Sequence, residues 1–190
     1  DMTIIGSHDE QVLGEKLKLE QNRKNILDEV FLGVDRMVPP FKSALIRSKL
    51  STSLDSESVS LLFASPVRDE SGIVRAVFAM AFDPMGTLSR IVRAGRTGES
   101  GEVYMFDNKG YLLTESRFRG TIEEMGFLES GQSAVLNIRL LDPGRSKSSE
   151  KGDGVDLKNT PLTFMATQAI GSKDGTNIDG YQDYRGIRVA

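Results

Sequence analysis

Three consecutive side chains near the middle of the chain have the types that chemistry needs. Residues 98–118 read GESGEVYMFDNKGYLLTESRF, and the second apolar run of this stretch ends on Glu115, Ser116 and Arg117. A carboxylate, a hydroxyl and a guanidinium in a row suit a nucleophile with its base, a clamp for an anionic ligand, or a polar staple at the end of a strand. The partners that the rest of the chain supplies decide among the three.

A nucleophilic role for Ser116 lacks the usual base. The single histidine, His8, lies near the start of the chain beside two acids, and there is no cysteine among the 190 residues. Neighbouring side chains of a strand point to opposite faces, so Glu115 and Arg117 would share one face and Ser116 the other. We therefore expect no catalysis by this chain. We favour a structural staple, in which Arg117 pairs with Glu115 or with an acid of 181–185. Binding of an anionic ligand by Arg117 remains the alternative.

Composition excludes several other classes of function. A net charge of −3 is the opposite of the basic stripe that a nucleic-acid surface needs. Without cysteine there are no disulfides and no thiolate metal sites, and neither the phosphate-loop nor the EF-hand spacing occurs, so we expect no cofactor and no metal ion. No run approaches the roughly 18 apolar residues of a membrane span. The start of the chain also lacks the pattern of a signal peptide, so we expect any anchor to lie outside the sequence.

The first half of the chain predicts a helix and several strands. The clearest signal is a hairpin, with apolar runs at 60–67 and 73–82 around a polar corner that ends in Gly72. The second run is apolar almost throughout, which we interpret as a central strand buried on both faces. Upstream, the pattern predicts an amphipathic helix over 11–29, a strand over 30–34 and another over 41–46, the two strands separated by Pro39-Pro40, and then a polar loop over 51–60.

After the first hairpin, Asp83 and Pro84 predict the start of a helix over 84–95, followed by a glycine-rich joint. The stretch 98–118 then forms a second hairpin, whose Asn-Lys-Gly corner tolerates a positive φ. The remaining predictions are a short helix over 121–128, a strand over 133–141, an exposed loop over 142–160, a helix over 161–170, for which periodicity alone does not exclude a strand, and a strand from 187. We expect an α+β fold of two small tandem units.

Several of these segments resemble one known family. The runs ASPVRDESGIVRAVFAMAFDP and GRTGESGEVYMFDNKGYLLTESRF, followed by LLDPG, PLTFMA and GYQDYRGIRV, resemble the double Cache sensor region of bacterial membrane receptors. The block G-x-x-G-E-x-Y-x-F-D-x-x-G at 98–110 is the most specific part. The resemblance covers most of residues 60–190 and is weaker before residue 60, where IIGSHDEQVLGEKL is similar to the entry of a first Cache unit.

The resemblance implies two PAS-like units with antiparallel sheets flanked by helices. A membrane-distal unit would span 1–83, a linker helix and glycine joint 84–97, and a membrane-proximal unit 98–190. Each unit would be incomplete, lacking strands before Thr3 and after Ala190. The chain would then be the small-molecule sensing segment of a signal-transduction receptor, such as a histidine kinase of a two-component system, another kinase or a cyclase. It would lie on the periplasmic or extracellular side of the inner membrane, held by transmembrane helices outside this sequence, with a homodimer left open.

Two groups of side chains are candidates for binding the unknown ligand. Residues of the first group would wall a cavity in the distal unit, although inward-facing aromatic residues also suit a core: Phe63, Ser65, Arg75 and Phe78. Residues of the second group mix aromatic and charged types and suit a structural strand equally well: Tyr104, Arg117, Tyr181 and Asp183. The ligand identity does not follow, because the amino-acid-binding set of the family includes a tryptophan and this chain has none.

Two rival functions make different structural predictions. A protein-protein interaction module without a small-molecule ligand predicts a filled core and an exposed apolar patch, whereas a sensor predicts a partly polar cavity. A hydrolase that uses Glu115 or Asp183 predicts a cleft that holds two close carboxylates.

Overall fold

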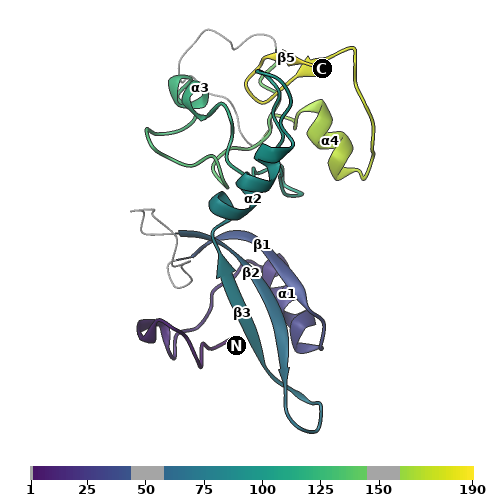
Figure 1. The fold of residues 1–190 in the computed structure, drawn as a ribbon. Coiled ribbons are helices and arrows are strands. Elements are labelled where there is room, and N and C mark those ends of the chain that lie inside the picture. The colour runs from purple at the N-terminus through teal and green to yellow at the C-terminus, as the bar shows by residue number, and fades with distance from the viewer. Residues whose placement is uncertain (1, 44–57, 145–158) are drawn as a thin grey trace. The chain divides into compact units, whose positions relative to one another are not determined.

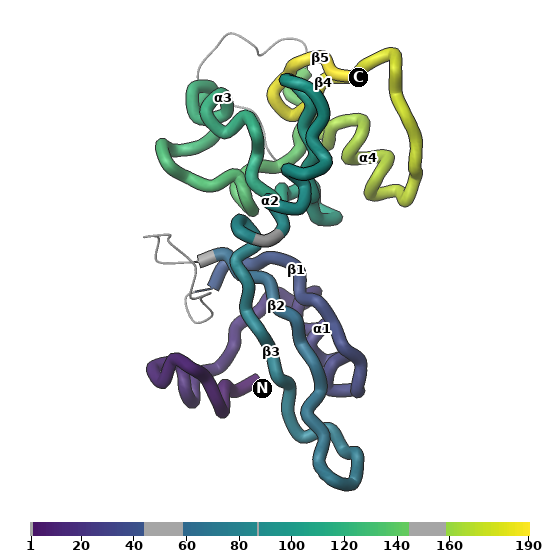
Figure 2. The backbone as a smooth tube through the Cα atoms, in the orientation of Figure 1, coloured from purple at the N-terminus to yellow at the C-terminus, as the bar shows by residue number. Residues whose placement is uncertain are grey.

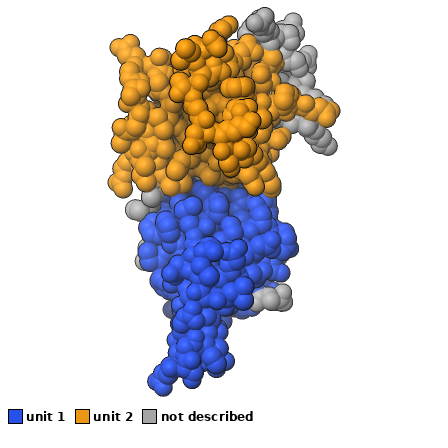
Figure 3. Space-filling model, turned by 90° about the vertical axis from the view of Figure 1, so that its right-hand side faces the viewer, with its two compact units in different colours: residues 1–87 blue, residues 88–190 orange. Residues whose placement is uncertain are grey.

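The computed structural model describes residues 2–43, 58–144 and 159–190 (Figure 2). Most of the predicted loops at 51–60 and 142–160 lie outside these described residues. The protein is a mixed α+β fold, and the chain divides into two compact units, Asp1–Thr87 and Leu88–Ala190 (Figure 3). The boundary between them falls within helix α2, Pro84–Ala94. The two units are described separately, as unit 1 and unit 2.

Unit 1 is built on an antiparallel sheet of three strands in the order β1–β2–β3 (Figure 1). These strands are β1 (Arg36–Ser43), β2 (Ser58–Arg68) and β3 (Val74–Phe82). The predicted hairpin is confirmed as β2 and β3, in a register that pairs Phe63 with Met80. The Asp69 side chain accepts hydrogen bonds from the amides of Ser71 and Ile73, which fixes the corner.

Helix α1, Gln21–Phe31, packs on one face of this sheet (Figure 1). Its residues Leu27 and Val30 join Val38 of β1 and Leu62 of β2 in a buried apolar cluster. The hydrophobic effect of this burial holds the helix to the sheet. Among residues 2–20, a short 3-10 helix, η1 (Glu10–Val12), is the one helix before α1.

Two predictions near α1 are wrong. The helix predicted over 11–29 begins only at Gln21, because Gly14 turns at a φ of +83° and the segment after it bonds back to the chain start, as in the bond from the Leu17 amide to the Met2 carbonyl. The strand predicted over 30–34 is instead the last turn of α1 and a turn at Gly33. Val30 continues the helical spacing of Leu27, which outweighs its preference for strands.

Strand β1 runs through Pro39-Pro40, where the sequence predicted a break between two strands. The register shifts by one residue there, since Val38 pairs with Leu62 and Phe41 pairs with Ser60. Such a bulge lets a strand accommodate residues that have no N–H to donate. The Pro40 carbonyl accepts a hydrogen bond of 2.8 Å from the buried Arg23 guanidinium of α1.

Strand β3 is not the central, doubly buried strand that its apolar sequence predicted. It lies at the edge of the sheet that the structure describes, and β2 is central. Phe78 and Met80 leave 57% and 48% of their surfaces exposed, because α1 covers only the opposite face. An apolar run predicts that both faces of a strand pack against apolar groups. It does not show whether another segment of this chain provides those groups.

Helix α2 follows β3 as predicted. The Asp83 carboxylate accepts a hydrogen bond of 2.8 Å from the Met85 amide, and Pro84 occupies the first position of the helix. The Asp83 side chain thus provides an acceptor for a backbone N–H that has no partner within the helix. The missing N–H of Pro84 loses no helical hydrogen bond, because the first N–H groups of a helix have no acceptor there.

Unit 2 contains little regular structure. Besides the end of α2, its described residues form α3 (Arg119–Glu124), α4 (Phe164–Ile170) and a two-stranded ribbon of β4 (Tyr181–Gln182) and β5 (Arg188–Val189). The helix predicted over 121–128 is shorter and starts earlier than expected. The segment 161–170 is a helix from Phe164, with the Thr163 side chain accepting from the Ala166 amide at its start.

The second predicted hairpin pairs only locally. Phe106 and Leu112 form a bridge across it, and the Asp107 carboxylate accepts from the amides of Lys109 and Tyr111 at the corner. The strand predicted over 133–141 is mostly wrong, because the chain turns at 134–137 and pairs only near its end. Gly110 needs its φ of +84°, and a side chain there would collide with Leu162.

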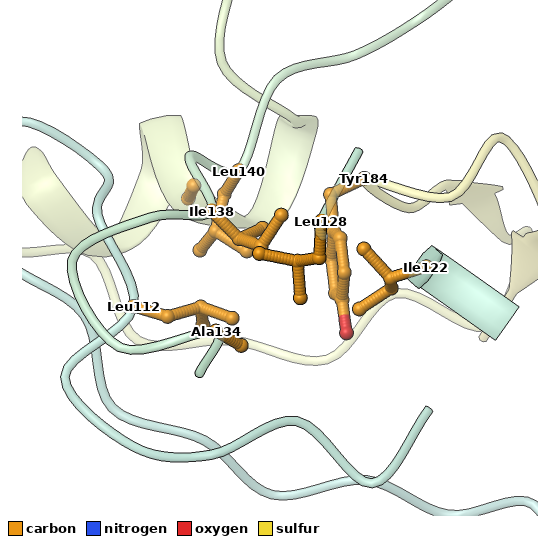
Figure 4. Close-up of a cluster of buried hydrophobic side chains, with 8 residues drawn as sticks. Leu112, Ile122, Leu128, Ala134, Ile138, Leu140 and Tyr184 are labelled. Atoms are coloured by element: carbon orange, nitrogen blue, oxygen red, sulfur yellow. The ribbon is translucent and has the colours of Figure 1, made fainter. Parts of the chain in front are cut away.

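The core of unit 2 collects side chains from segments far apart in the sequence (Figure 4). Aliphatic residues surround the ring of Tyr184, which Figure 4 shows beside Ile122 and Leu128. The members with no exposed surface are Leu112, Ala134, Leu140 and Ala166. These packing contacts connect the hairpin, the 133–141 segment and the C-terminal ribbon, so they take the place of a regular sheet.

Candidate functional site

The face of the unit 1 sheet that α1 does not cover carries exposed apolar side chains. Because side chains alternate along a strand, the register places one set of residues on this face. Leu61, at one end of this set, is fully buried. We call the exposed members of the set, together with Asp35, which precedes β1 and bonds to Ser65, the open face: Asp35, Met37, Phe63, Ser65, Val67, Phe78 and Met80. Its five apolar members are each between 44% and 57% exposed. A group of half-exposed large apolar residues on one sheet face is typical of a surface that binds a ligand or a partner.

The register orders the open face into two rows across the strands. One row joins Met37, Phe63 and Met80. In the next row Ser65 pairs with Phe78, and the Ser65 hydroxyl donates a hydrogen bond to the Asp35 carboxylate. The face therefore combines apolar side chains with one carboxylate, which a hydroxyl of the central strand orients.

Three of the four predicted residues in unit 1 lie together on this face, and the fourth does not. Phe63, Ser65 and Phe78 are members of the open face, whereas the Arg75 guanidinium forms a 2.7 Å ion pair with Asp69 at the hairpin corner. This ion pair and the amides of the corner hold the pKa of the Asp69 carboxyl below its ordinary value of 3.8. Arg75 therefore supports the turn. Asp35 precedes β1 and belongs to no motif, so the residue pattern does not predict its place on this face.

The Glu-Ser-Arg run of unit 2 is bound by partners different from those predicted. Arg117 pairs neither with Glu115 nor with an acid of 181–185. Its guanidinium donates to the carbonyls of Gly98 and Gly101, at 3.2 and 2.8 Å. The Glu115 carboxylate accepts from the Ser133 hydroxyl and from the Ala134 amide, at 2.8 and 2.9 Å. The run therefore has the structural role predicted for a polar staple. Its charged side chains, however, form hydrogen bonds with backbone groups and hydroxyls rather than with an oppositely charged side chain.

Ser116 belongs to a compact network with Glu102 and Tyr184, which we call the Glu102 network. The Ser116 hydroxyl lies 2.8 Å from Glu102 Oε1 and 2.8 Å from the Tyr184 hydroxyl. The Tyr184 hydroxyl in turn donates to Glu102 Oε2 at 2.9 Å, and the Arg117 amide donates to Oε1. Burial first, and the Glu102 charge second, raise the pKa of Tyr184 far above its ordinary value, so its hydroxyl stays a donor.

The other predicted residues of unit 2 also have structural partners. The ring of Tyr104 packs at a right angle to Tyr184 with centroids 5.9 Å apart, and burial raises the pKa of its hydroxyl. Tyr181 is half-buried against Phe164, and burial raises its pKa as well. The buried Asp183 accepts from the guanidinium and amide of Arg185 and from the amide of Ile187.

Arg185 completes this arrangement through an aromatic contact. Its guanidinium carbon lies 3.6 Å from the centre of the Phe118 ring, a distance at which a cation interacts favourably with the ring face. Asp183 and Arg185 thus neutralise each other in a buried ion pair at 4% and 9% exposure. This pair has the geometry of a structural support.

The described residues contain neither a metal-binding cluster nor a helix that could cross a membrane. In the part of the chain that the structure describes, no three or more histidine, cysteine, aspartate or glutamate side chains are grouped to hold a metal ion. Among these residues, no helix has the length and apolar character to cross a membrane.

Comparisons with known proteins do not place the chain in a family. No protein family, no curated protein and no solved structure matches this sequence or its fold. The resemblance in the motif at 98–110 therefore remains a prediction from the residues alone.

Proposed function

We propose that this chain is the small-molecule sensing segment of a membrane-anchored receptor, made of two tandem PAS-like units and without catalytic activity of its own. The open face of unit 1 is the observation that carries the proposal. A three-stranded sheet covered by a helix on one side leaves apolar side chains in water on the other, and a bound solute would remove them from water.

The chemistry of the open face indicates what kind of solute it would bind. Phe63 and Phe78 offer ring faces with negative electrostatic potential, and Asp35 adds a carboxylate beside them. An apolar body would contact the rings and Met37, and a positively charged or hydrogen-bond-donating group would meet Asp35. The four predicted residues of unit 2 already contact other side chains or backbone groups of that unit, so the proposal assigns ligand binding to unit 1.

The receptor context is proposed on the sequence motifs. The extracytoplasmic location, the membrane anchors outside this sequence and a kinase or cyclase output follow from the resemblance to double Cache sensors. In this scheme, a ligand with different affinities for two arrangements of the segment would shift their populations, and α2 connects the unit that binds to the unit that follows.

A binding screen with paired variants tests the proposal. Amines, amino acids, organic acids and polyamines would be screened by thermal shift, and hits would be measured by calorimetric titration. A ligand present at 100 times its Kd should stabilise the fold by about 2.7 kcal/mol. Phe63→Ser should abolish this stabilisation, and Asp35→Asn should weaken it for cationic hits.

Phe127→Ser is the matched control for this screen. Phe127 belongs to unit 2 and is 42% exposed, close to the 47% of Phe63, so both substitutions remove a half-exposed ring. Loss of binding in both variants, or in neither, would place the ligand elsewhere and refute the assignment to the open face. The absence of any hit across the library would contradict sensing.

Docking of a protein on the open face is the second candidate function. The observation that favours it is the same set of half-exposed apolar side chains, which fits an interaction module as well as a sensor. A second copy of this chain is the simplest partner. Sedimentation equilibrium over a wide range of concentrations should then show a dimer that Phe63→Ser disrupts and Phe127→Ser does not. A monomer at every concentration would exclude self-docking.

A further inference from the structure

The Glu102 network joins two segments that are 82 residues apart in the sequence. Glu102 directly follows the joint, residues 95–101, which comes after α2, and Tyr184 lies in the C-terminal ribbon, residues 181–189. Ser116, at the end of the hairpin, touches both. None of the candidate ligand contacts of unit 1 takes part in this network.

The hydrogen-bonding capacity of the three groups makes their positions interdependent. Ser116 and Tyr184 have one hydroxyl proton each, so at most two of the three oxygen–oxygen contacts of 2.8 to 2.9 Å are hydrogen bonds at any one time. Every contact therefore depends on the other two. Displacing one group leaves a carboxylate oxygen or a phenol without its partner in a site where Ser116 and Tyr184 are 5% and 6% exposed, and unpaired polar groups are costly there.

Further bonds connect each end of the network to a whole segment. On one side, the Arg117 amide donates to Glu102, and the Arg117 guanidinium donates to the carbonyls of Gly98 and Gly101 in the joint. On the other side, Tyr184 is adjacent to Asp183, whose carboxylate holds the amides of Arg185 and Ile187 and so fixes the turn of the ribbon.

We propose that the Glu102 network is a conformational coupling element, through which the arrangement of the joint after α2 and the arrangement of the C-terminal ribbon depend on each other. The coupling is a free energy shared between two segments of one unit, so it acts in both directions. It does not rest on the proposed function, since it would exist with any ligand or partner. The two discrete states are the network closed and the network opened.

Residue-resolved hydrogen exchange on the whole chain tests the coupling in both directions. Glu102→Gln keeps the shape of the side chain and removes its charge, and it should speed exchange of the Asp183 and Ile187 amides in the ribbon. Tyr184→Phe keeps the buried ring and removes its hydroxyl, and it should speed exchange of the Arg96 and Arg117 amides. We expect rises on the order of tenfold, the size that follows from losing one hydrogen bond to a charged group.

Matched variants separate coupling from a purely local effect. Tyr181→Phe removes a phenol hydroxyl three residues from Tyr184 and outside the network, so it should leave the Arg96 and Arg117 amides unchanged. Ser116→Ala removes the shared hydroxyl and should raise exchange at both ends, which tests the coupling if Tyr184→Phe does not fold.

Two results would overturn the proposal. One is faster exchange confined to the segment that carries the substitution. The other is an equal rise at the core amides of Leu112 and Leu140, which would show that the network only stabilises unit 2 as a whole. A double-mutant cycle of Glu102→Gln and Tyr184→Phe gives an independent check, because coupled groups have non-additive effects on the unfolding free energy and independent groups have additive ones.

Discussion

Unit 1 and unit 2 hold their chains together by different means. Unit 1 uses the backbone hydrogen bonds of a three-stranded sheet with one helix packed on it, and the apolar residues of the open face lie exposed on the other side of the sheet. In the described part of unit 2 the regular sheet is limited to a ribbon of two strands with two residues each. Side chains such as Glu102, Glu115 and Asp183 bind the backbone and hydroxyl groups of this unit. The comparison indicates that unit 1 has surface available for binding, whereas the polar groups of unit 2 are engaged in its own structure.

The largest expected loss of stability follows from a cavity in the core of unit 2. Leu112 is fully buried in the cluster of Figure 4, and Leu112→Ala should lower the unfolding free energy by about 4 kcal/mol, the transfer term plus the cost of a cavity. Chemical denaturation measures the change. Ile178→Ala, at a residue of the same unit that is 85% exposed, should change stability by less than about 0.5 kcal/mol. Equal effects would contradict the packing of this core.

The two faces of the unit 1 sheet should respond differently to neighbouring substitutions. Leu62 faces α1 and is 2% exposed, so Leu62→Ala should cost about 3 kcal/mol. Phe63 is the next residue on the open face, and Phe63→Ala should cost about 1 kcal/mol at most, since nearly half of its surface is already in water. Denaturation of both variants under one condition provides the comparison. A large loss at Phe63 would mean that the open face is covered in the folded protein.

The third prediction concerns the polar support of unit 2. Glu115→Ala leaves the Ala134 amide and the Ser133 hydroxyl without their acceptor, and a buried donor left unpaired costs about 2 kcal/mol. The exposed Glu99 of the same unit gives the control, since Glu99→Ala should have little effect on denaturation. If the two variants were equally stable, the polar bonds of unit 2 would not be what holds it together.

The smallest expected effect on stability concerns the carboxylate at the hairpin corner of unit 1. The folded-state pKa of Asp69 is depressed by its bond to Arg75 and by the backbone amides, so its ionised form favours the folded state. This stabilising contribution is present above the ordinary pKa of 3.8 and is lost as the pH falls through the lower folded-state value. Asp69→Asn should flatten the stability profile in that acidic window and leave the profile near neutral pH nearly parallel to that of the unaltered chain. A curve unchanged in the acidic window would contradict the role of this carboxylate.

Local signals in the sequence predicted the parts of the fold that depend on neighbouring residues. The β2–β3 hairpin, the start of α2 at Asp83-Pro84 and the Asp-Asn-Lys-Gly corner follow from turn and capping chemistry within a few residues. The same reasoning failed for the run 133–141 and for the extent of α1. Those outcomes depend on contacts with distant segments, which a periodicity cannot contain.

The amino-acid sequence by itself determined the α+β composition, the two hairpin corners, the polar character of the Glu-Ser-Arg run and the lack of cysteine chemistry. Only the tertiary structure decided that β3 lies at an edge, that Asp35 meets Ser65, and that Ser116 joins Glu102 to Tyr184. The reason is physical. Turn and capping preferences are properties of a few adjacent residues, whereas burial and side-chain partners depend on which distant segments the hydrophobic effect brings together.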